Sequence, residues 1–264
     1  MLSRPIYIFA WLLLLATILW LLPQTAGLKW SNLDYRQSTG VKRQWVDTRT
    51  TPWNAVGRLK MPRGICSATL IGVDVIVTAR HCLAENSQSR SGFSTTQTSR
   101  KPNEVMFQLE RDGSFADVSL LKDIYLPPVT PGISRPALLR SDYAFARLLK
   151  PVPLSLYHIG SLPSVATHSP QQGSLVNQAG YGGNPKRISA DEGCLIVAIT
   201  NNSLVQHNCL INFGDSGGPL FYGQNDSWSL VGINSYMEEL NGVKHAFAIG
   251  PENYYRDLTN FMRP

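Results

Sequence analysis

The sequence predicts an all-β protein with two similar halves and one helix at the C-terminal end. Short runs rich in Val, Ile, Thr and Leu recur from Val56 onward and are separated by Gly and Pro, as in strands joined by turns. Only residues 251–264 have helical spacing, which puts Tyr254, Leu258 and Phe261 on one face. A proline-containing stretch, residues 153–164, separates the halves, so two β-barrels or sandwiches are expected.

The predicted strands alternate with turn signals along the whole chain. In the first half they are residues 56–60, 66–72, 74–79, 104–113, 115–126 and 143–149. In the second half they are residues 174–182, 194–199, 218–222, 228–236 and 245–250. A chain of 264 residues with 43% hydrophobic side chains can bury a core in each half. The formal net charge of +6 is spread along the chain, so no nucleic-acid partner is expected.

The N-terminus has the features of an export segment. Arg4 precedes an apolar run from Pro5 to Leu22, and small residues follow it. The run is long for a signal peptide and just short of a comfortable membrane span. We therefore expect residues 1–27 to be a signal peptide, with an uncleaved N-terminal membrane anchor as the alternative. The protein is then secreted or periplasmic, or else anchored and facing outside the cytoplasm, with residues 28–40 as a leader or propeptide.

The chain has four cysteines, and their even number in an exported protein suggests two disulfides. Of the three pairings, the most local joins Cys66 with Cys82 and Cys194 with Cys209. Each bridge would close a loop of about 15 residues, a span worth about 3 kcal/mol. Zinc ligation is the alternative, but the spacings are not those of a zinc finger or ribbon. We expect no metal site, and a structural or solvent-facing role for four histidines: His158, His168, His207 and His245.

Three short stretches carry residues of catalytic type. VIVTARHC (75–82) puts His81 after a strand-like run, SDYAFARLLK (141–150) puts Asp142 before one, and GDSGGP (214–219) puts Ser216 among glycines. Each alone has an ordinary explanation as a packed histidine, a turn aspartate or a Gly-rich turn.

Together and in this order, the three stretches resemble the TAAHC, DIALL and GDSGGP motifs of the trypsin-like (chymotrypsin-fold) serine peptidases. GDSGGP is a complete match, whereas TARHC has Arg80 where the family has a small residue. The resemblance covers about residues 40–264. It implies two six-stranded antiparallel β-barrels, chymotrypsin-like, with a short C-terminal helix, in a peptidase domain at 41–264. Barrel 1 would span about 41–150 and barrel 2 about 160–264.

The resemblance also implies the activity of a serine endopeptidase that works through an acyl-enzyme. His81 would act as the base for Ser216, and Asp142 would hold the histidine tautomer. The backbone N–H groups of Gly214 and Ser216 would form the oxyanion hole. Polypeptides are the expected substrates, no cofactor is implied, and we expect a monomer.

Two other readings of the motifs remain open. GDSGG also fits G-x-S-x-G, the nucleophile elbow of α/β-hydrolases, but that fold needs a helix after Ser216 and the sequence there predicts a strand. The chain could also be a catalytically silent peptidase homologue that acts as a binding module. Retention of all three triad residues favours the enzyme.

Further stretches resemble the glutamyl-endopeptidase-like branch of the family, namely residues 39–59 and the NQAGYGG segment at 177–183. Leu210, six residues before Ser216, occupies the position of the trypsin aspartate, so no strong preference for Lys or Arg is expected. Asn234 stands where glutamyl-specific members carry a histidine, which argues against an acidic preference.

The following residues, Ser235, Tyr236 and Met237, match the strand that pairs with the substrate backbone. Met237 should narrow the pocket entrance. A small or medium apolar side chain is the expected substrate residue.

Asp215 raises the question of activation. In the trypsin family a newly freed N-terminal amine pairs with the aspartate before the nucleophile, and Val41 is a candidate N-terminus here. The alternative is that an internal side chain or backbone donors satisfy Asp215, in which case there is no zymogen.

Overall fold

The computed structural model describes most of the chain beyond its N-terminal part. The described residues are 43–85, 98–111, 113–130, 132–184, 186–201, 203–224, 227–240 and 243–263. The expected export segment (1–27), the leader (28–40) and Val41 lie outside these ranges. In the described part, no helix combines the length and the apolar character needed to cross a membrane.

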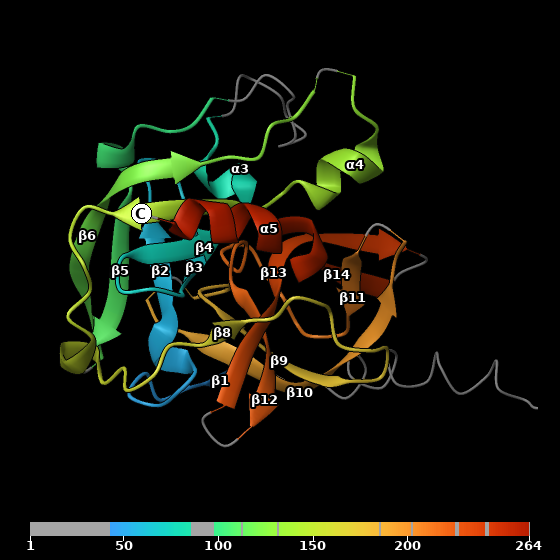
Figure 1. Ribbon diagram of the computed structural model, residues 1–264. Helices are drawn as coiled ribbons and strands as arrows, with labels where there is room; N and C mark the ends of the chain where they lie inside the picture. The colour runs from blue at the N-terminus through green and yellow to red at the C-terminus, as the bar shows by residue number, and fades with distance from the viewer. Residues whose placement is uncertain are drawn as a thin grey trace, which may run out of the picture. The chain divides into compact units, whose positions relative to one another are not determined.

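The first half forms a closed antiparallel barrel, drawn in blue to green in Figure 1. Its six strands follow the order β2-β3-β4-β7-β6-β5, and pairing of β2 with β5 closes the ring. The strands are β2 (Val56–Lys60), β3 (Ile65–Leu70), β4 (Val75–Thr78), β5 (Met106–Arg111), β6 (Ser114–Tyr125) and β7 (Ala144–Leu148). Each overlaps a strand expected from the sequence.

The second half closes in the same way. Six antiparallel strands follow the order β10-β11-β14-β13-β12-β9, and pairing of β9 with β10 completes the ring. The strands are β9 (Leu175–Gly180), β10 (Ser189–Ile199), β11 (Leu204–His207), β12 (Pro219–Gln224), β13 (Ser227–Leu240) and β14 (Val243–Ile249). The predicted pair of six-stranded barrels is therefore confirmed.

Two short strands lie outside the rings. β8 (Ser164–Val165) pairs with β13 in parallel, and β1 (Gln44–Trp45) pairs with β10. The attachment of β1 differs from the expectation that residues from 41 onward belong to the first barrel. The chain enters along the second barrel and begins the first barrel only at Val56.

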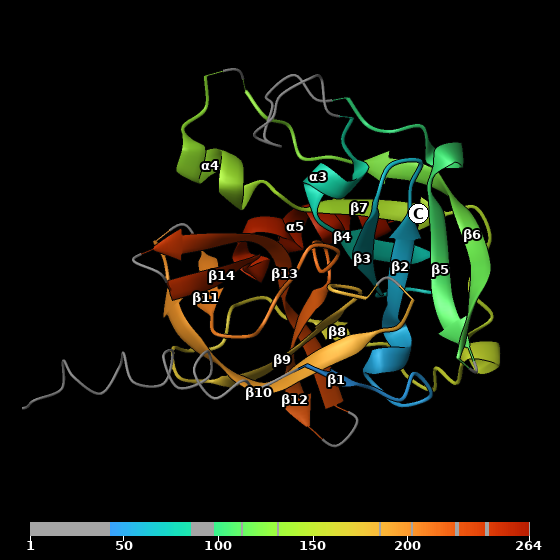
Figure 2. The same cartoon turned by 180° about the vertical axis from the view of Figure 1, so that it is seen from behind.

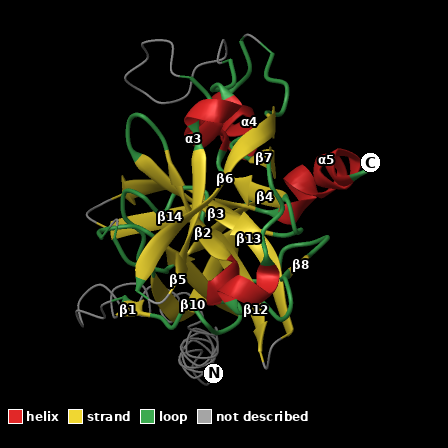
Figure 3. Cartoon of the chain, turned by 90° about the vertical axis from the view of Figure 1, so that its left-hand side faces the viewer, coloured by secondary structure: helices red, strands yellow, loops and turns green. Residues whose placement is uncertain are grey.

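Strands dominate the fold, and the helices are short (Figure 3). α5 (Pro251–Met262) is the predicted C-terminal helix, and it buries Tyr254 and Leu258. α3 (Arg80–Leu83) and α4 (Arg135–Arg140) were not expected from the sequence, because helices of four and six residues are too short to show a helical period. The 3-10 turns span Trp53–Ala55, Pro102–Glu104 and Leu154–Tyr157.

One apolar cluster joins the two barrels. It includes Val77 and Phe145 from the first barrel, Tyr181 and Ile233 from the second, and Tyr254 from α5. Figures 1 and 2 show α5 alongside strands of both barrels. Because this core is shared, loops from the two barrels are held in a fixed relation where they meet.

Candidate active site

His81 lies on α3, directly after β4 of the first barrel. Its backbone N–H donates to Asp142 Oδ1 over 2.9 Å, and its Nδ1 lies 2.8 Å from Asp142 Oδ2. The His81 side chain is 26% exposed, whereas that of Asp142 is 1% exposed. Burial of the ring tends to lower the pKa of His81, but the charge and hydrogen bond of Asp142 outweigh it and leave the pKa above its ordinary value of 6.5.

Asp142 connects the two barrels at this point. It lies between α4 and β7, and its Oδ2 also accepts a hydrogen bond from Ser235 Oγ on β13. From the sequence, Ser235 was expected only as a substrate-binding residue, and this contact was not predicted. A serine within a strand has no local signature that would reveal its partner.

Arg80, the departure from the family motif, turns away from solvent. Its side chain is buried and donates to the carbonyl of Pro127. Burial lowers the pKa of Arg80, and the nearby charge of Asp142 opposes this effect. The substitution thus adds a buried cation beside the histidine turn and removes none of the candidate catalytic groups.

The turn that carries Ser216 is packed against the first barrel. The Ser67 N–H donates to the Ser216 carbonyl over 2.9 Å, and Ser67 Oγ donates to the Gly214 carbonyl over 2.8 Å. Gly217 has a φ of +80°, and a Cβ atom there would lie 2.0 Å from Thr78 Oγ1. Both the backbone conformation and the close approach therefore require glycine after the candidate nucleophile.

The four backbone N–H groups from Gly214 to Gly217 differ in whether they have an acceptor. Those of Asp215 and Gly217 donate to main-chain carbonyls over 3.0 and 2.7 Å. Those of Gly214 and Ser216 donate to no protein group among the residues that the structure describes. They are the two that the sequence analysis expected to form the oxyanion hole.

His81 and Ser216 line a single pocket of about 370 Å³. The full lining is His81, Ile211, Asn212, Phe213, Asp215, Ser216, Ser235, Tyr236 and Met237. Phe213 is 97% exposed and Met237 is 40% exposed, so apolar side chains border the opening. Asp215 is the one carboxylate in this lining, and it is paired with an arginine.

The predicted substrate-binding residues are distributed unevenly. Tyr236 and Met237 line the pocket together with Ser235, but Leu210 does not. The N–H of Leu210 donates to Asp191 Oδ2 over 2.8 Å, and the next residue, Ile211, is the one that lines the pocket. Ile211 and Phe213 were not predicted as pocket residues, although their position just before GDSGGP was a usable signal.

Asp215 is held by an internal side chain. Arg43 Nη1 donates to Asp215 Oδ2, and the two side chains are 7% and 1% exposed. The structure thus shows an internal side chain as the partner of Asp215, as the alternative expected, whereas Val41 lies outside the described residues. Arg43 could not be predicted as this partner, because no local sequence pattern links it to a residue 172 positions away.

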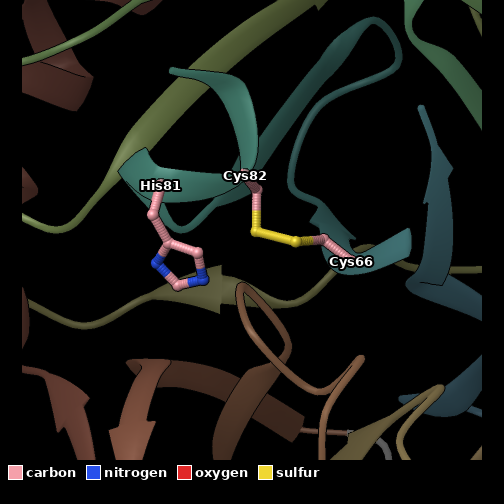
Figure 4. Close-up of side chains that lie close together, drawn as sticks. All are labelled: Cys66, His81 and Cys82. Carbon is pink, nitrogen blue, oxygen red and sulfur yellow. A yellow bond between two sulfur atoms is a disulfide. The ribbon is translucent and has the colours of Figure 1, made fainter. Parts of the chain in front are cut away.

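Both predicted disulfides, Cys66–Cys82 and Cys194–Cys209, are present. Figure 4 shows the His81 ring beside the first of them, next to α3. The ligand-type atoms of Cys66, His81 and Cys82 lie within 4.8 Å of one another. Because the two sulfurs are bonded to each other, they are not thiolates that could bind a metal.

Comparison with known proteins agrees with the geometry. No curated protein matches the chain significantly. A family model described as a trypsin-like peptidase domain matches residues 66–233, which is more than half of the chain and includes His81, Asp142 and Ser216. The α/β-hydrolase alternative is wrong, because strand β12 follows Ser216 and both barrels are antiparallel. The chain therefore belongs to the trypsin-like peptidase family.

Proposed function

We propose that the protein is an exported serine endopeptidase that cleaves polypeptides through an acyl-enzyme. One observation carries this proposal: His81 and Ser216 line the same pocket, and the carboxylate of Asp142 lies behind the histidine. A serine hydroxyl is a weak nucleophile at neutral pH and needs an adjacent base. A histidine fixed by a buried carboxylate supplies that base.

The proposed reaction uses only groups of this chain and water. Ser216 Oγ attacks the substrate carbonyl carbon and passes its proton to His81 Nε2. The resulting oxyanion accepts hydrogen bonds from the N–H groups of Gly214 and Ser216, a type of contact worth roughly 3 kcal/mol per donor in the barrier. The C–N bond then breaks, and His81 protonates the leaving amine. Water, with His81 again as base, hydrolyses the acyl-enzyme and releases Ser216.

The hydrogen bonds around Asp142 support its assignment as the orienting residue. The carboxylate accepts from the His81 backbone N–H, from His81 Nδ1 and from Ser235 Oγ. These contacts keep the imidazole in the tautomer that leaves Nε2 as the proton acceptor, and the negative charge stabilises the imidazolium that forms.

The pocket supports an apolar preference for the substrate side chain. Ile211, Phe213 and Met237 contribute to the lining, and the charge of the one carboxylate there is matched by Arg43. A lysine or arginine side chain would find no free anion among the described lining residues. The likeness of residues 39–59 and 177–183 to the glutamyl-endopeptidase-like branch stays part of this proposal, without that branch's acidic preference.

Two disulfides support export, because such bonds persist in oxidising compartments. The apolar N-terminal segment supplies the route, either as a signal peptide or as an anchor. We propose a secreted or periplasmic protein, or one that is anchored with its peptidase domain outside the cytoplasm.

Covalent labelling with a fluorophosphonate probe tests the function directly. The purified full chain is expected to react at Ser216, whereas Ser216→Ala should lose both labelling and hydrolysis of an unfolded protein substrate. Ser114→Ala is the matched control, because Ser114 is exposed at the start of β6 and lies outside the pocket lining. A folded wild-type chain that neither labels nor cleaves would favour the silent homologue, and activity retained by Ser216→Ala would refute the assignment of the nucleophile.

A further inference from the structure

The side chain of Asp215 is buried at the centre of the candidate oxyanion turn. Its side chain is 1% exposed. Its backbone N–H donates to the Asn212 carbonyl and its carbonyl accepts from the Gly218 N–H, so the turn closes around it. The two N–H groups of the expected oxyanion hole, on Gly214 and Ser216, belong to the residues on either side. Any movement of Asp215 would therefore move both donors.

Three groups converge on the Asp215 carboxylate. Oδ1 accepts from the Gly182 N–H over 2.9 Å, and Oδ2 accepts from the Asn212 N–H over 2.7 Å. The third group is the Arg43 guanidinium on Oδ2. Among the described residues that contact this carboxylate, Arg43 is the one that carries a charge. An anion this deeply buried is stable only when its charge is compensated.

The surroundings are shaped for this ion pair. A Cβ atom on Gly182 would lie 2.1 Å from Asp215 Oδ2, so the carboxylate fills the space that a side chain would need. Arg43 also donates through Nη2 to the carbonyls of Gly180 and Ser189. The planar guanidinium thus bonds the carboxylate and two strand ends at once, a pattern that suits arginine better than lysine.

Arg43 is held in place by the short strand that follows it. Gln44 and Trp45 form β1, which pairs with Ala190 and Ser189 of β10. The guanidinium of Arg187 lies 5.3 Å from the Trp45 ring centre, and Val46 is buried in the core shared by the barrels. The position of Arg43 therefore depends on β1 pairing and core packing, and it requires no free chain end.

We infer that Arg43 is the positioning residue that holds the oxyanion turn in its active form, and that the peptidase is active without a cut that frees a new N-terminus near Val41. This inference rests on the proposed function. The guanidinium supplies, from within the chain, the positive charge that a freed amine would otherwise bring to Asp215.

Replacement of Arg43 in the full chain tests this role. Arg43→Met should lower kcat by about 100-fold or more and leave KM within a few-fold, because the oxyanion donors act in the transition state. Arg43→Lys should recover part of the loss, since it restores the charge without the two carbonyl contacts. Arg147→Met is the matched control. Arg147 pairs with Asp74 over 3.0 Å in a half-buried site outside the pocket, and its loss should leave kcat unchanged.

The outcomes separate this inference from the proposed function. Wild-type protein that mass spectrometry shows to be uncut near Val41 should react with the fluorophosphonate probe and cleave the protein substrate. Full activity in Arg43→Met, or activity that appears only after cleavage at or near Val41, would overturn the role of Arg43 while leaving the peptidase assignment standing. If Arg43→Met does not fold, Arg43→Lys decides, and a wild-type kcat in that variant overturns the inference. A wild-type chain that is inactive with or without cleavage contradicts the proposed function itself.

Discussion

Ser67 connects the first barrel to the turn that carries Ser216. Removal of its hydroxyl tests how strongly that connection stabilises the site. The side chain is fully buried on β3. Its Oγ donates to the Gly214 carbonyl over 2.8 Å and accepts from the Tyr181 N–H over 3.0 Å. Ser67→Ala removes one atom and leaves two buried backbone groups without these partners.

The expected loss of stability follows from those two contacts. A buried polar group that loses its partner costs about 1 to 3 kcal/mol, so two such groups with some relaxation should lower the free energy of unfolding by about 3 kcal/mol. Thr69 is the matched control, because it is also fully buried on β3 and its Oγ1 has no hydrogen-bond partner among the described residues. Thr69→Val removes an unpaired hydroxyl and should leave stability unchanged or slightly higher.

The assay is equilibrium unfolding in urea under non-reducing conditions. Both substitutions are made on a Ser216→Ala background, so that self-cleavage does not distort the transition. The same substitutions in the active chain report on catalysis, and Ser67→Ala should lower kcat because the Gly214 carbonyl is no longer tied. If Ser67→Ala is as stable as its Ser216→Ala parent, or no less stable than Thr69→Val on that background, the hydroxyl does not anchor the turn.

Three further predictions concern titration and the pocket. The value of kcat/KM should rise with pH through a midpoint above 6.5, because Asp142 raises the pKa of His81 and only neutral imidazole acts as base; a midpoint below 6.5 in a pH–rate profile would contradict this. Burial lowers the pKa of His207 from 6.5 to about 4. Between these two pH values, His207 is therefore protonated in the unfolded chain and neutral in the folded chain. The free energy of unfolding should fall by about 3 kcal/mol as the pH falls from 7 to 4, and His207→Leu, measured by urea unfolding at both pH values, should remove that part of the dependence. Met237→Gly should shift cleavage in a peptide library toward larger apolar side chains, and an unchanged profile would show that Met237 does not limit the entrance.

Much of this protein could be predicted from local sequence pattern. Strands such as β3 and β4 can be recognised as runs of β-branched and apolar residues next to turn residues. β11 and α4 were missed, because each is too short to carry a period of its own and is stabilised by its neighbours. The strand β1 was not expected either, and its pairing with β10 could not be predicted, since two residues cannot specify their partner strand.

The candidate site also contains residues that could be predicted from the sequence and contacts that could not. His81, Asp142 and Ser216 could be named as candidates from the sequence, because the three stretches that hold them resemble, together and in that order, the motifs of one peptidase family. The contact from Ser235 to Asp142 spans 93 positions, and that from Arg43 to Asp215 spans 172. Both depend on how the barrels close and pack against each other. The sequence alone determined which residues are candidates for the catalytic groups. Only the tertiary structure decided which distant side chains contact Asp142 and pair with the charge of Asp215, because hydrogen bonds and ion pairs form between neighbours in space.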